Sequence, residues 1–278
     1  MRMLLVPAAT ALGLLAMLLG GLAVFQRNLI YPGAFIAGQR ARLPVPPGTE
    51  SISLVTADEE RLHALWRPPW PGCGVVVSFH GNGSRPEPAA ARFTAPPWSG
   101  AGWGVLAIAY RGYPGSTGAP SEDGLIADGL AAAAEVARRS PGAPILLHGH
   151  SLGAAVAVAV AERAPHLGLY LEAPFDSLPG IVRLAFPYAP TILLRDTWRS
   201  DRRIARAGGP VLIVHGTEDG VVPVKLGRRL ATAAGPQARF EAVAGNHVSV
   251  LGSRDRQAEA MFGDPLRAAC PVQAAATP

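Results

Sequence analysis

The chain has 278 residues, of which 49% are hydrophobic and 16% charged, so it can bury a sizeable core and wholesale disorder is excluded. Its net charge of +5 comes almost entirely from arginine, because Lys225 is the one lysine. The arginines are scattered as isolated pairs, not gathered in a stripe with interleaved aromatic residues, so we expect no nucleic-acid partner.

An uncharged stretch opens the chain, from Met3 to Phe25. About 20 apolar residues span a bilayer as a helix, whereas the apolar core of a secretory signal has about 7–15. We therefore expect residues 1–27 to form an anchor in a membrane, the bacterial inner membrane. The alternative is a cleaved signal segment, because Gly21-Leu22-Ala23 offers small residues to a signal peptidase; the protein would then be secreted or periplasmic. Arginines on both sides of the stretch leave the membrane face open.

A linker and a hairpin follow this stretch. Residues 28–50 are expected to form the linker, because the prolines among residues 43–50 exclude a helix there. Apolar residues then alternate on both sides of the polar turn at residues 58–60, which predicts a β-hairpin. This hairpin opens the main domain, predicted over residues 51–265, and residues 266–278 are expected to form a tail.

Short apolar runs alternate with Ala-rich stretches of helical spacing through the rest of the domain. Strands that are buried on both faces read as continuous apolar runs, so this alternation predicts parallel βαβ units and the α/β class. The predicted strands lie at residues 75–77, 105–108, 145–147, 169–171 and 211–214, and the predicted helices at 122–139, 152–163 and 223–234.

The interval between Leu171 and Val211 breaks this alternation, because it holds several prolines and no clear strand. We expect a small cap insertion at about residues 175–209. Its apolar residues close a substrate pocket on one interpretation and complete the core on the other. The sequence leaves both interpretations open.

The segment Gly149-His150-Ser151-Leu152-Gly153 has the pattern G-x-S-x-G. The pattern alone is weakly specific, but this copy follows a predicted strand and opens a predicted helix, which is the setting of a nucleophile elbow. Glycines flank the serine in such a turn because the backbone is strained and leaves little room for neighbouring Cβ atoms. Ser151 is therefore the predicted nucleophile.

A serine nucleophile needs a general base, which in this arrangement comes last in the chain, after an acid. Of the seven histidines, six precede the elbow, lie inside it, follow it too closely or lie at the end of a predicted strand. The remaining one, His247, lies in a loop after the predicted strand at residues 240–243. By elimination, His247 is the predicted base.

The acid that orients the base should follow the preceding strand. The run at residues 211–214 leads into a turn-rich segment that contains Asp219, and this is the predicted acid. Asp176, after the strand before it, is the alternative, and Glu218 is a weaker one. Asp201, in the expected cap, has a structural role on this interpretation.

Two backbone amides should stabilise the oxyanion. One is predicted to be that of Leu152, directly after the nucleophile. The other should lie in the loop after the strand at residues 75–79; Asn82 is preferred, with Gly83 as the alternative. His80 in the same loop is expected to brace it without taking part in the chemistry.

The two cysteines, Cys73 and Cys270, show no spacing typical of a metal site. We expect no metal and no cofactor. Two unpaired thiols are the preferred interpretation of the cysteines, and a disulfide in an oxidising compartment is the alternative.

Several motifs resemble those of the α/β-hydrolases related to Bem46 and to the mammalian α/β-hydrolase-domain membrane hydrolases. The resemblance covers residues 52–250, and residues 26–32 are similar to the segment that follows the anchor in such proteins. The matching motifs are Phe79-His80-Gly81-Asn82, Tyr110-Arg111-Gly112-Tyr113 with Ser116 and Gly118, Gly149–Gly153, Leu171-Glu172-Ala173-Pro174-Phe175, and His215-Gly216 with Asp219, Val222 and Pro223.

The resemblance implies an α/β-hydrolase fold, with a mostly parallel eight-stranded sheet flanked by helices and a small cap. It also implies the triad already argued, no metal or cofactor, and acyl ester, thioester or lysophospholipid substrates. The chain departs from the family in having several prolines after Gly83, where a helix usually continues unbroken, and Pro114 where glycine is common.

The preferred function is hydrolysis of an acyl ester or thioester through an acyl-enzyme at Ser151. A peptidase or amidase would use the same triad, so the triad does not separate these two functions. A third hypothesis is a catalytically silent binding module on the same fold, which an intact set of catalytic residues opposes.

Overall fold

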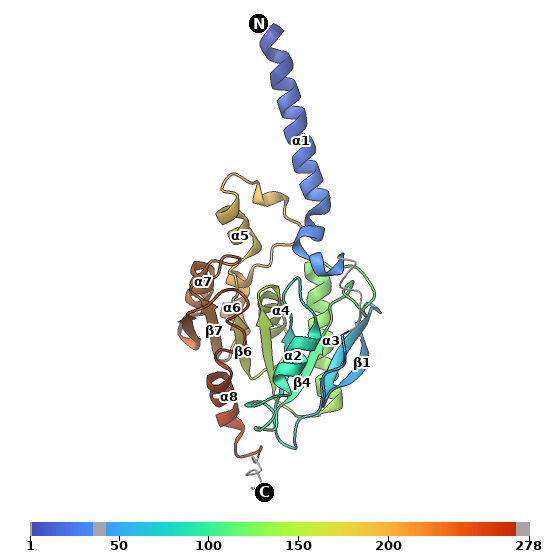
Figure 1. Cartoon of the computed structure of the whole chain (residues 1–278), viewed down its shortest axis with the longest axis vertical. Coiled ribbons are helices and arrows are strands. Elements are labelled where there is room, and N and C mark those ends of the chain that lie inside the picture. The colour runs from blue at the N-terminus through green and yellow to red at the C-terminus, as the bar shows by residue number, and fades with distance from the viewer. Residues whose placement is uncertain (1, 36–42, 271–278) are drawn as a thin grey trace.

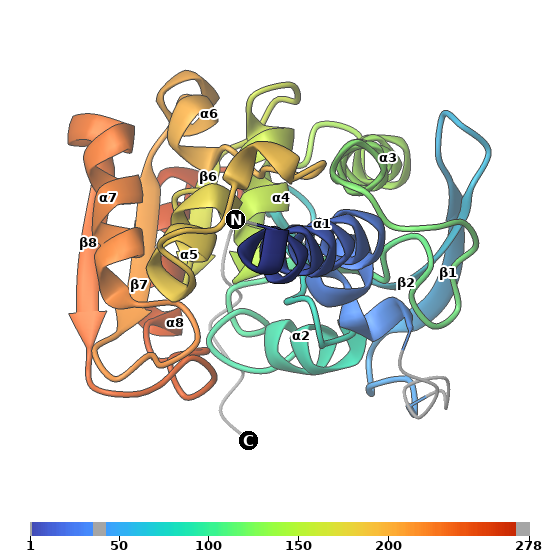
Figure 2. The ribbon, with the colours of Figure 1, turned by 90° about the horizontal axis from the view of Figure 1, so that it is seen from above.

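An eight-stranded sheet lies between two layers of helices in the computed structural model, which describes residues 2–35 and 43–270 (Figure 2). The strand order is β1-β2-β4-β3-β5-β6-β7-β8; β2 pairs antiparallel with β1 and β4, and all other neighbouring strands are parallel. The predicted α/β fold with a mostly parallel sheet is therefore confirmed.

The predicted strands and helices are all present. The strands are β1 (Glu50–Val55), β2 (Arg61–Arg67), β3 (Val75–Phe79), β4 (Gly104–Ile108), β5 (Ile145–His150), β6 (Gly168–Glu172), β7 (Val211–Gly216) and β8 (Ala238–Val243). The helices are α1 (Arg2–Ile30), α2 (Pro86–Phe93), α3 (Glu122–Arg139), α4 (Leu152–Ala161), α5 (Leu178–Ala185), α6 (Ser200–Ala207), α7 (Val224–Ala234) and α8 (Asp255–Gly263), with short 3-10 turns η1 (Pro32–Ala34), η3 (Thr191–Leu193), η4 (Gly235–Gln237) and η5 (Asp264–Leu266).

The central strands are buried on both faces, which explains their continuous apolar sequence. On β3, Val75, Val77 and Phe79 pack into the core under α3 and α4, whereas Val76 points into a second core on the other face. That second core contains aromatic side chains from α2 and α8, among them Phe93 and Phe262. Figure 2 shows α3, α4 and α6 on one side of the sheet and α2 and α8 on the other.

The predicted hairpin is confirmed by the pairing of β1 with β2. Ile52 lies opposite Ala64 and Leu54 opposite Leu62, so the alternating apolar residues of the two strands face the same core. The turn between the strands includes Glu59 with a positive φ of 67°.

The prolines after Gly83 do not prevent a helix there. Pro86 is the first residue of α2 and Pro88 lies in its first turn, where no intrahelical hydrogen bond from the backbone nitrogen is lost. The chain therefore keeps a helix after the loop at residues 80–84, although a short one.

The interval between β6 and β7 contains three helical elements, α5, η3 and α6. Helix α6 packs against α4 and α7 and so belongs to the helical layer on the sheet. Leu178, Ile181 and Leu184 of α5 are partly buried against the core, whereas Tyr188 and Ile192 are almost fully exposed. The apolar residues of this interval thus divide between core and surface.

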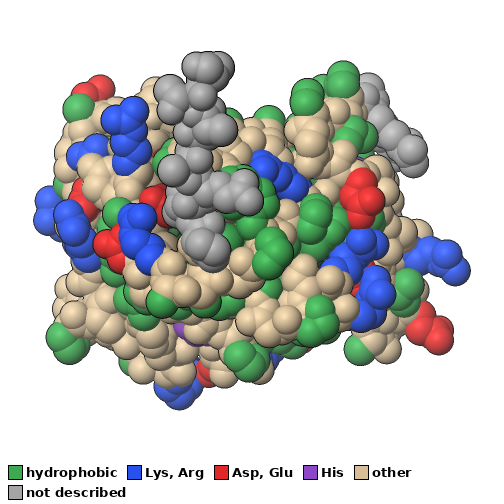
Figure 3. Space-filling view, turned by 90° about the horizontal axis from the view of Figure 1, so that it is seen from below, with side chains coloured by type: hydrophobic (Ala, Val, Ile, Leu, Met, Phe, Trp, Pro, Cys, Tyr) green, Lys and Arg blue, Asp and Glu red, His purple; other side chains and the backbone are tan. Residues whose placement is uncertain are grey.

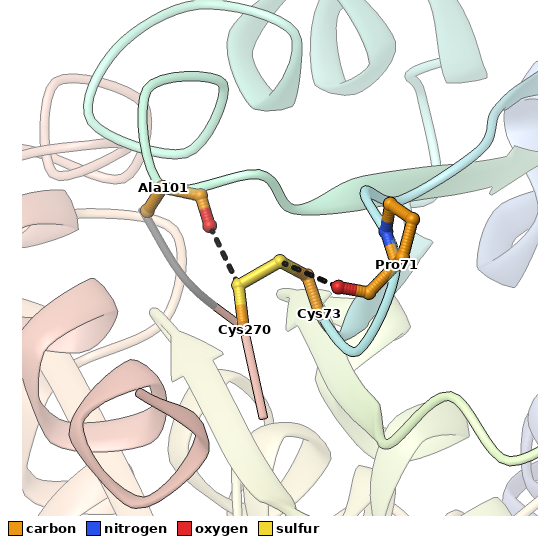
Figure 4. The surroundings of a disulfide bond; sticks show 4 residues. All are labelled: Pro71, Cys73, Ala101 and Cys270. Atoms are coloured by element: carbon orange, nitrogen blue, oxygen red, sulfur yellow. Dashed lines mark hydrogen bonds between the residues drawn. A yellow bond between two sulfur atoms is a disulfide. The ribbon is translucent and has the colours of Figure 1, made fainter. Parts of the chain in front are cut away.

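Cys73 and Cys270 form a disulfide, so the preference for two unpaired thiols was wrong (Figure 4). Their sequence separation of 197 residues hid their proximity, because only the packing of the chain end against the loop at Gly72 brings them together. The sulfur of Cys270 also lies 3.4 Å from the carbonyl oxygen of Ala101. Part of the expected tail, residues 271–278, lies outside the described residues, as do residues 36–42 of the expected linker.

Helix α1 begins the described chain and projects away from the rest of the molecule (Figure 1). It extends three residues beyond the segment 1–27 that was expected to be an anchor, and Met1 lies outside the described residues. Over the parts of the chain that the structure describes, no helix has both the length and the apolar character needed to cross a membrane. The predicted anchor at residues 1–27, and with it the predicted location in a membrane, is therefore wrong.

The arginines of the surface are dispersed among carboxylates. Figure 3, which views the end of the molecule opposite α1, shows lysine and arginine side chains in separate groups with acidic side chains between them. Many are paired, for example Arg254 with Glu241 and Arg267 with Asp264.

Candidate active site

Ser151 stands at the turn between β5 and α4, at the carboxyl edge of the parallel strands. Its backbone has φ 55° and ψ −116°, a conformation that a residue with a side chain adopts at a cost of about 1–3 kcal/mol. The amide of Ser151 donates to the carbonyl oxygen of Glu172 at the end of β6, at 2.9 Å. The turn is thereby fixed to the neighbouring strand.

The glycines on either side of Ser151 are required by close backbone contacts. A Cβ atom on Gly149 would lie 2.3 Å from the carbonyl oxygen of Gly153, and one on Gly153 would lie 1.9 Å from that of Phe79. No real Cβ atom fits at such distances, so the G-x-S-x-G spacing follows from packing between the elbow and β3.

Asp219 and His247 are joined by a hydrogen bond. Nδ1 of His247 donates to Oδ2 of Asp219 at 2.7 Å, and the Asp219 side chain is fully buried. The other carboxylate oxygen, Oδ1, accepts from the amides of Val221 and Val222 at 2.9 and 2.8 Å. The carboxylate is therefore held in place by hydrogen bonds to both of its oxygens.

The loop that carries His247 lies directly against the end of β7. The amides of Thr217 and Glu218 donate to the carbonyl oxygens of Val243 and Gly245. A Cβ atom on Gly216 would lie 2.3 Å from the Gly245 oxygen, so glycine is needed where these two backbones meet.

The elbow and the His247 loop meet at His150. Nε2 of His150 donates to the carbonyl oxygen of His247 at 2.9 Å, and the two imidazole rings lie 4.9 Å apart. Burial, together with the nearby His247, lowers the pKa of His150 to about 4. The residue before Ser151 is thus a neutral donor that fixes the backbone of His247.

The alternative acids have other partners. Oδ1 of Asp176 accepts from the amide of Ser177, the N-cap residue of α5, at 2.6 Å. Glu218 is exposed, and Asp201 pairs with Arg199. His215, fully buried, places Nε2 2.8 Å from the Val222 oxygen and 3.2 Å from Oδ2 of Asp219, so it supports the carboxylate.

Hydrogen bonds to two consecutive carbonyl oxygens fix the loop at residues 80–84, called here the oxyanion loop. The Gly81 oxygen accepts from Nδ1 of His80 at 2.7 Å and from the Ser84 amide at 3.0 Å. The Asn82 oxygen accepts from the Tyr113 hydroxyl at 2.7 Å and from the Gly33 amide at 3.2 Å. Because N–H and C=O point in opposite directions across a trans peptide, these bonds orient the amides of Asn82 and Gly83.

Leu152, the other predicted oxyanion donor, is the first residue of α4. Its amide is one of the four at a helix start that have no intrahelical partner. The aligned dipoles of α4 also favour negative charge at this end.

A buried ion cluster beneath the site was missed from the sequence. Glu172, fully buried, accepts hydrogen bonds from Arg92 at 2.6 Å, from His148 at 2.8 Å and from the Gly252 amide at 2.8 Å. Burial would raise the pKa of Glu172, but Arg92 and His148 outweigh burial and hold that pKa well below its usual range. Arg92 also binds Asp255 at the start of α8. The one signal in the sequence was a charged residue directly after a buried strand.

Comparisons with known proteins identify the family of the chain. The family model described as serine aminopeptidase, S33, matches residues 71–194. Protein bem46 of Schizosaccharomyces pombe is 33% identical over 235 residues, which are 78% of this chain and 76% of that protein. The chain belongs to the Bem46-related α/β-hydrolases. The resemblance noted in the sequence is thereby confirmed.

The chain is also similar to other proteins, of known and unknown activity. An uncharacterized protein of Mycobacterium tuberculosis is 34% identical over 245 residues, 86% of this chain and 87% of that protein. Lysophosphatidylserine lipase ABHD12 of Macaca fascicularis is 32% identical over 161 residues, 51% of this chain and 40% of that protein. Among solved structures, an esterase of Pyrococcus furiosus has the same fold, with a TM-score of 0.66 at 17% identity over 83% of this chain and 96% of that one.

Proposed function

We propose that this α/β-hydrolase cleaves acyl ester or thioester bonds with Ser151 as nucleophile, His247 as general base and Asp219 as the orienting acid. The observation that carries the proposal is the 2.7 Å hydrogen bond from His247 to a buried carboxylate, in a loop that His150 joins to the elbow. With Nδ1 committed to Asp219, Nε2 of His247 is the ring atom left for proton transfer.

The proposed reaction has two halves. Nε2 of His247 takes the proton from Oγ of Ser151 while Oγ attacks the acyl carbon, and the imidazolium then protonates the departing alcohol or thiol. This leaves an acyl-enzyme on Ser151. Water, deprotonated by the same Nε2, attacks the acyl carbon, and Oγ leaves with the returned proton, which releases the carboxylic acid.

The oxyanion of each tetrahedral intermediate would be held by the amides of Leu152 and Asn82. The dipole of α4 supports the first of these donors. The hydrogen bonds that His80 and Ser84 make to the Gly81 oxygen support the second, because they set the direction of the Asn82 amide before substrate binds. Preorganised donors of this kind contribute about 2.7–4 kcal/mol each to lowering the barrier.

The ester preference is supported by relatives named as a lipase and an esterase. Amide or peptide hydrolysis is a second candidate, because the matching family model is described as a serine aminopeptidase. The proposed triad serves both reactions, so the two are separated by the substrate alone.

A substrate series tests the proposal. Chromogenic esters and thioesters of increasing acyl length should be hydrolysed by the wild type, with aminoacyl anilides cleaved far more slowly. The variant Ser151→Ala should lose about 10⁴-fold or more in kcat/KM on every ester. Full activity in Ser151→Ala contradicts the proposed nucleophile, and faster turnover of anilides than of esters favours the second candidate.

A further inference from the structure

One short segment contacts both the oxyanion loop and the chain between η3 and α6. Residues 26–34, the last turn of α1 followed by η1, are called here the α1–η1 segment. They hydrogen-bond to residues 193–196, which belong to the arm that returns from η3 toward the sheet, and also to the oxyanion loop. We call residues 191–198 the cap arm. Figure 1 shows the end of α1 between the cap arm and α3.

The contacts to the cap arm centre on Asp196, which is 2% exposed. Arg27 binds both carboxylate oxygens of Asp196, through Nε at 3.0 Å and Nη2 at 3.1 Å. The hydroxyl of Tyr31 donates to the same carboxylate at 3.0 Å and accepts from the Trp198 indole at 3.1 Å. A bidentate pair with a buried carboxylate fixes orientation as well as distance.

Gln26 adds a second attachment to the same arm. Its amide oxygen accepts from the Arg195 amide at 2.7 Å, and its amide nitrogen donates to the Leu193 carbonyl at 3.1 Å. Both backbone partners lie within the cap arm, so the arm is bonded along its length and not at a single point. Leu193 follows Ile192, whose side chain is 91% exposed.

The contact to the oxyanion loop is made by η1. The amide of Gly33 donates to the Asn82 oxygen, and a Cβ atom on Gly33 would lie 2.8 Å from that oxygen and 2.4 Å from the Tyr113 ring. The hydroxyl of Tyr113 donates to the same Asn82 oxygen. Glycine at position 33 thus allows η1 to pack directly on the loop that bears the second oxyanion amide.

We infer that the α1–η1 segment is a positioning element of the active site, in which Arg27 sets the cap arm that receives the acyl chain and Gly33 sets the oxyanion loop. This inference rests on the proposed ester hydrolysis. It assigns Arg27, Tyr31 and Gly33 a part in specificity and turnover, although all three lie in a segment far from the triad in sequence.

The two attachments predict two different kinetic defects. Arg27→Met should loosen the cap arm, raising KM for a long-chain ester about tenfold while the constants for an acetyl ester change less than about twofold. Gly33→Ala should displace the oxyanion loop and lower kcat about tenfold or more on both esters, with KM nearly unchanged. Tyr113→Phe, which removes one donor to the Asn82 oxygen, should lower kcat about threefold in the same way.

Matched controls separate positioning from general instability. Arg202→Met removes an exposed arginine of α6, outside the cap arm, and Gly20→Ala adds a Cβ atom to α1 where no atom lies within 4 Å. Both controls should keep the wild-type constants on both esters. Thermal unfolding of each variant identifies any that fail to fold, and Tyr113→Phe then serves in place of Gly33→Ala.

The outcomes are distinct. Wild-type kinetic constants in Arg27→Met, Gly33→Ala and Tyr113→Phe overturn the inference. It is also overturned if Arg27→Met loses the same fraction of its activity on both esters and that loss matches its loss of stability. A wild type that hydrolyses neither ester contradicts the proposed function itself, and the inference falls with it.

Discussion

His80 is buried in the oxyanion loop and His150, directly before Ser151, is partly buried; loss of solvent around each ring lowers its pKa to about 4. In an unfolded chain a histidine titrates near 6.5, so between these values the unfolded chain binds protons that the folded chain does not. The contribution of these neutral histidines to the free energy of unfolding is therefore complete above about pH 6.5 and is lost as the pH falls toward about 4.

The free energy of unfolding should accordingly fall by up to about 3 kcal/mol for each of these histidines across that range. Urea unfolding at several pH values between about 4 and about 7.5 measures how steeply the free energy of unfolding changes with pH. His80→Asn should show a smaller slope than the wild type, and equal slopes would contradict neutral burial of His80.

The acid of the triad can be tested against its own neighbour in the chain. Asp219→Asn keeps the shape of the side chain but removes the charge that His247 needs, and should lower kcat about 10³–10⁴-fold on esters. Glu218→Gln makes the same chemical change at an exposed position one residue away, and should keep wild-type activity. If both variants lose activity equally, or neither does, Asp219 is not the acid.

At the scale of these residues, the sequence predicted the hydrogen bond from His247 to Asp219 through chain order and elimination, because the acid and base of this fold follow fixed strands. It did not predict the second histidine on the carboxylate, His215, since nothing local distinguishes it from a strand residue. Burial of its ring is set by packing against Gly227, far along the chain.

Secondary-structure elements were predictable for similar physical reasons. The strands of the parallel sheet are buried on both faces, so their sequences are continuous apolar runs. The helix after the elbow consists almost entirely of small, apolar residues. The side-chain contacts between elements that are distant in sequence were not predictable. Arg92 on α2, Glu172 on β6 and Asp255 on α8 form one ion cluster, yet they are widely separated in sequence.

This cluster should hold the His247 loop in place, because Glu172 accepts from the Gly252 amide and its own carbonyl oxygen accepts from the Ser151 amide. Glu172→Gln leaves Arg92 buried with one carboxylate fewer and should lower the free energy of unfolding by about 3–5 kcal/mol. It should also lower kcat on esters, since both loops of the site depend on it.

The same substitution in a more exposed ion pair serves as the control for Glu172→Gln. Glu162→Gln weakens the pair with the exposed Arg206 and should cost less than about 1 kcal/mol. A loss in Glu172→Gln no larger than in Glu162→Gln would show that the buried cluster does not hold these elements together.

For the molecule as a whole, the disulfide closes a loop of 197 residues between a turn before β3 and the end of the described chain. A cross-link of this kind stabilises the fold mainly by restricting the unfolded chain, typically by about 2–5 kcal/mol. Cys270→Ser should lower the urea midpoint by a corresponding amount and leave ester kinetics unchanged. Reduction of the wild type should reproduce the effect, and an unchanged midpoint in both would contradict a stabilising role.

Prediction from sequence was weakest at this largest scale. The uncharged stretch at the start indicated a membrane anchor, and the structure contradicts it; the two cysteines gave no sign of their pairing. The pairing of the cysteines depends on where distant parts of the chain lie, which composition and spacing do not encode. The polar residues after that stretch gave no sign either that Arg27 and Tyr31 would bond to Asp196 across the fold.

The central claim, that the chain is a serine hydrolase acting through Ser151, is tested most directly by mapping a covalent adduct. A fluorophosphonate ester should modify the folded wild type at one site, and tryptic digestion should place the adduct on Ser151 within the peptide of residues 140–163. Ser151→Ala should take up no label, whereas Ser253→Ala, at an exposed serine near the His247 loop, should label at the wild-type rate. An adduct on another residue, or equal labelling of folded Ser151→Ala, would contradict the account.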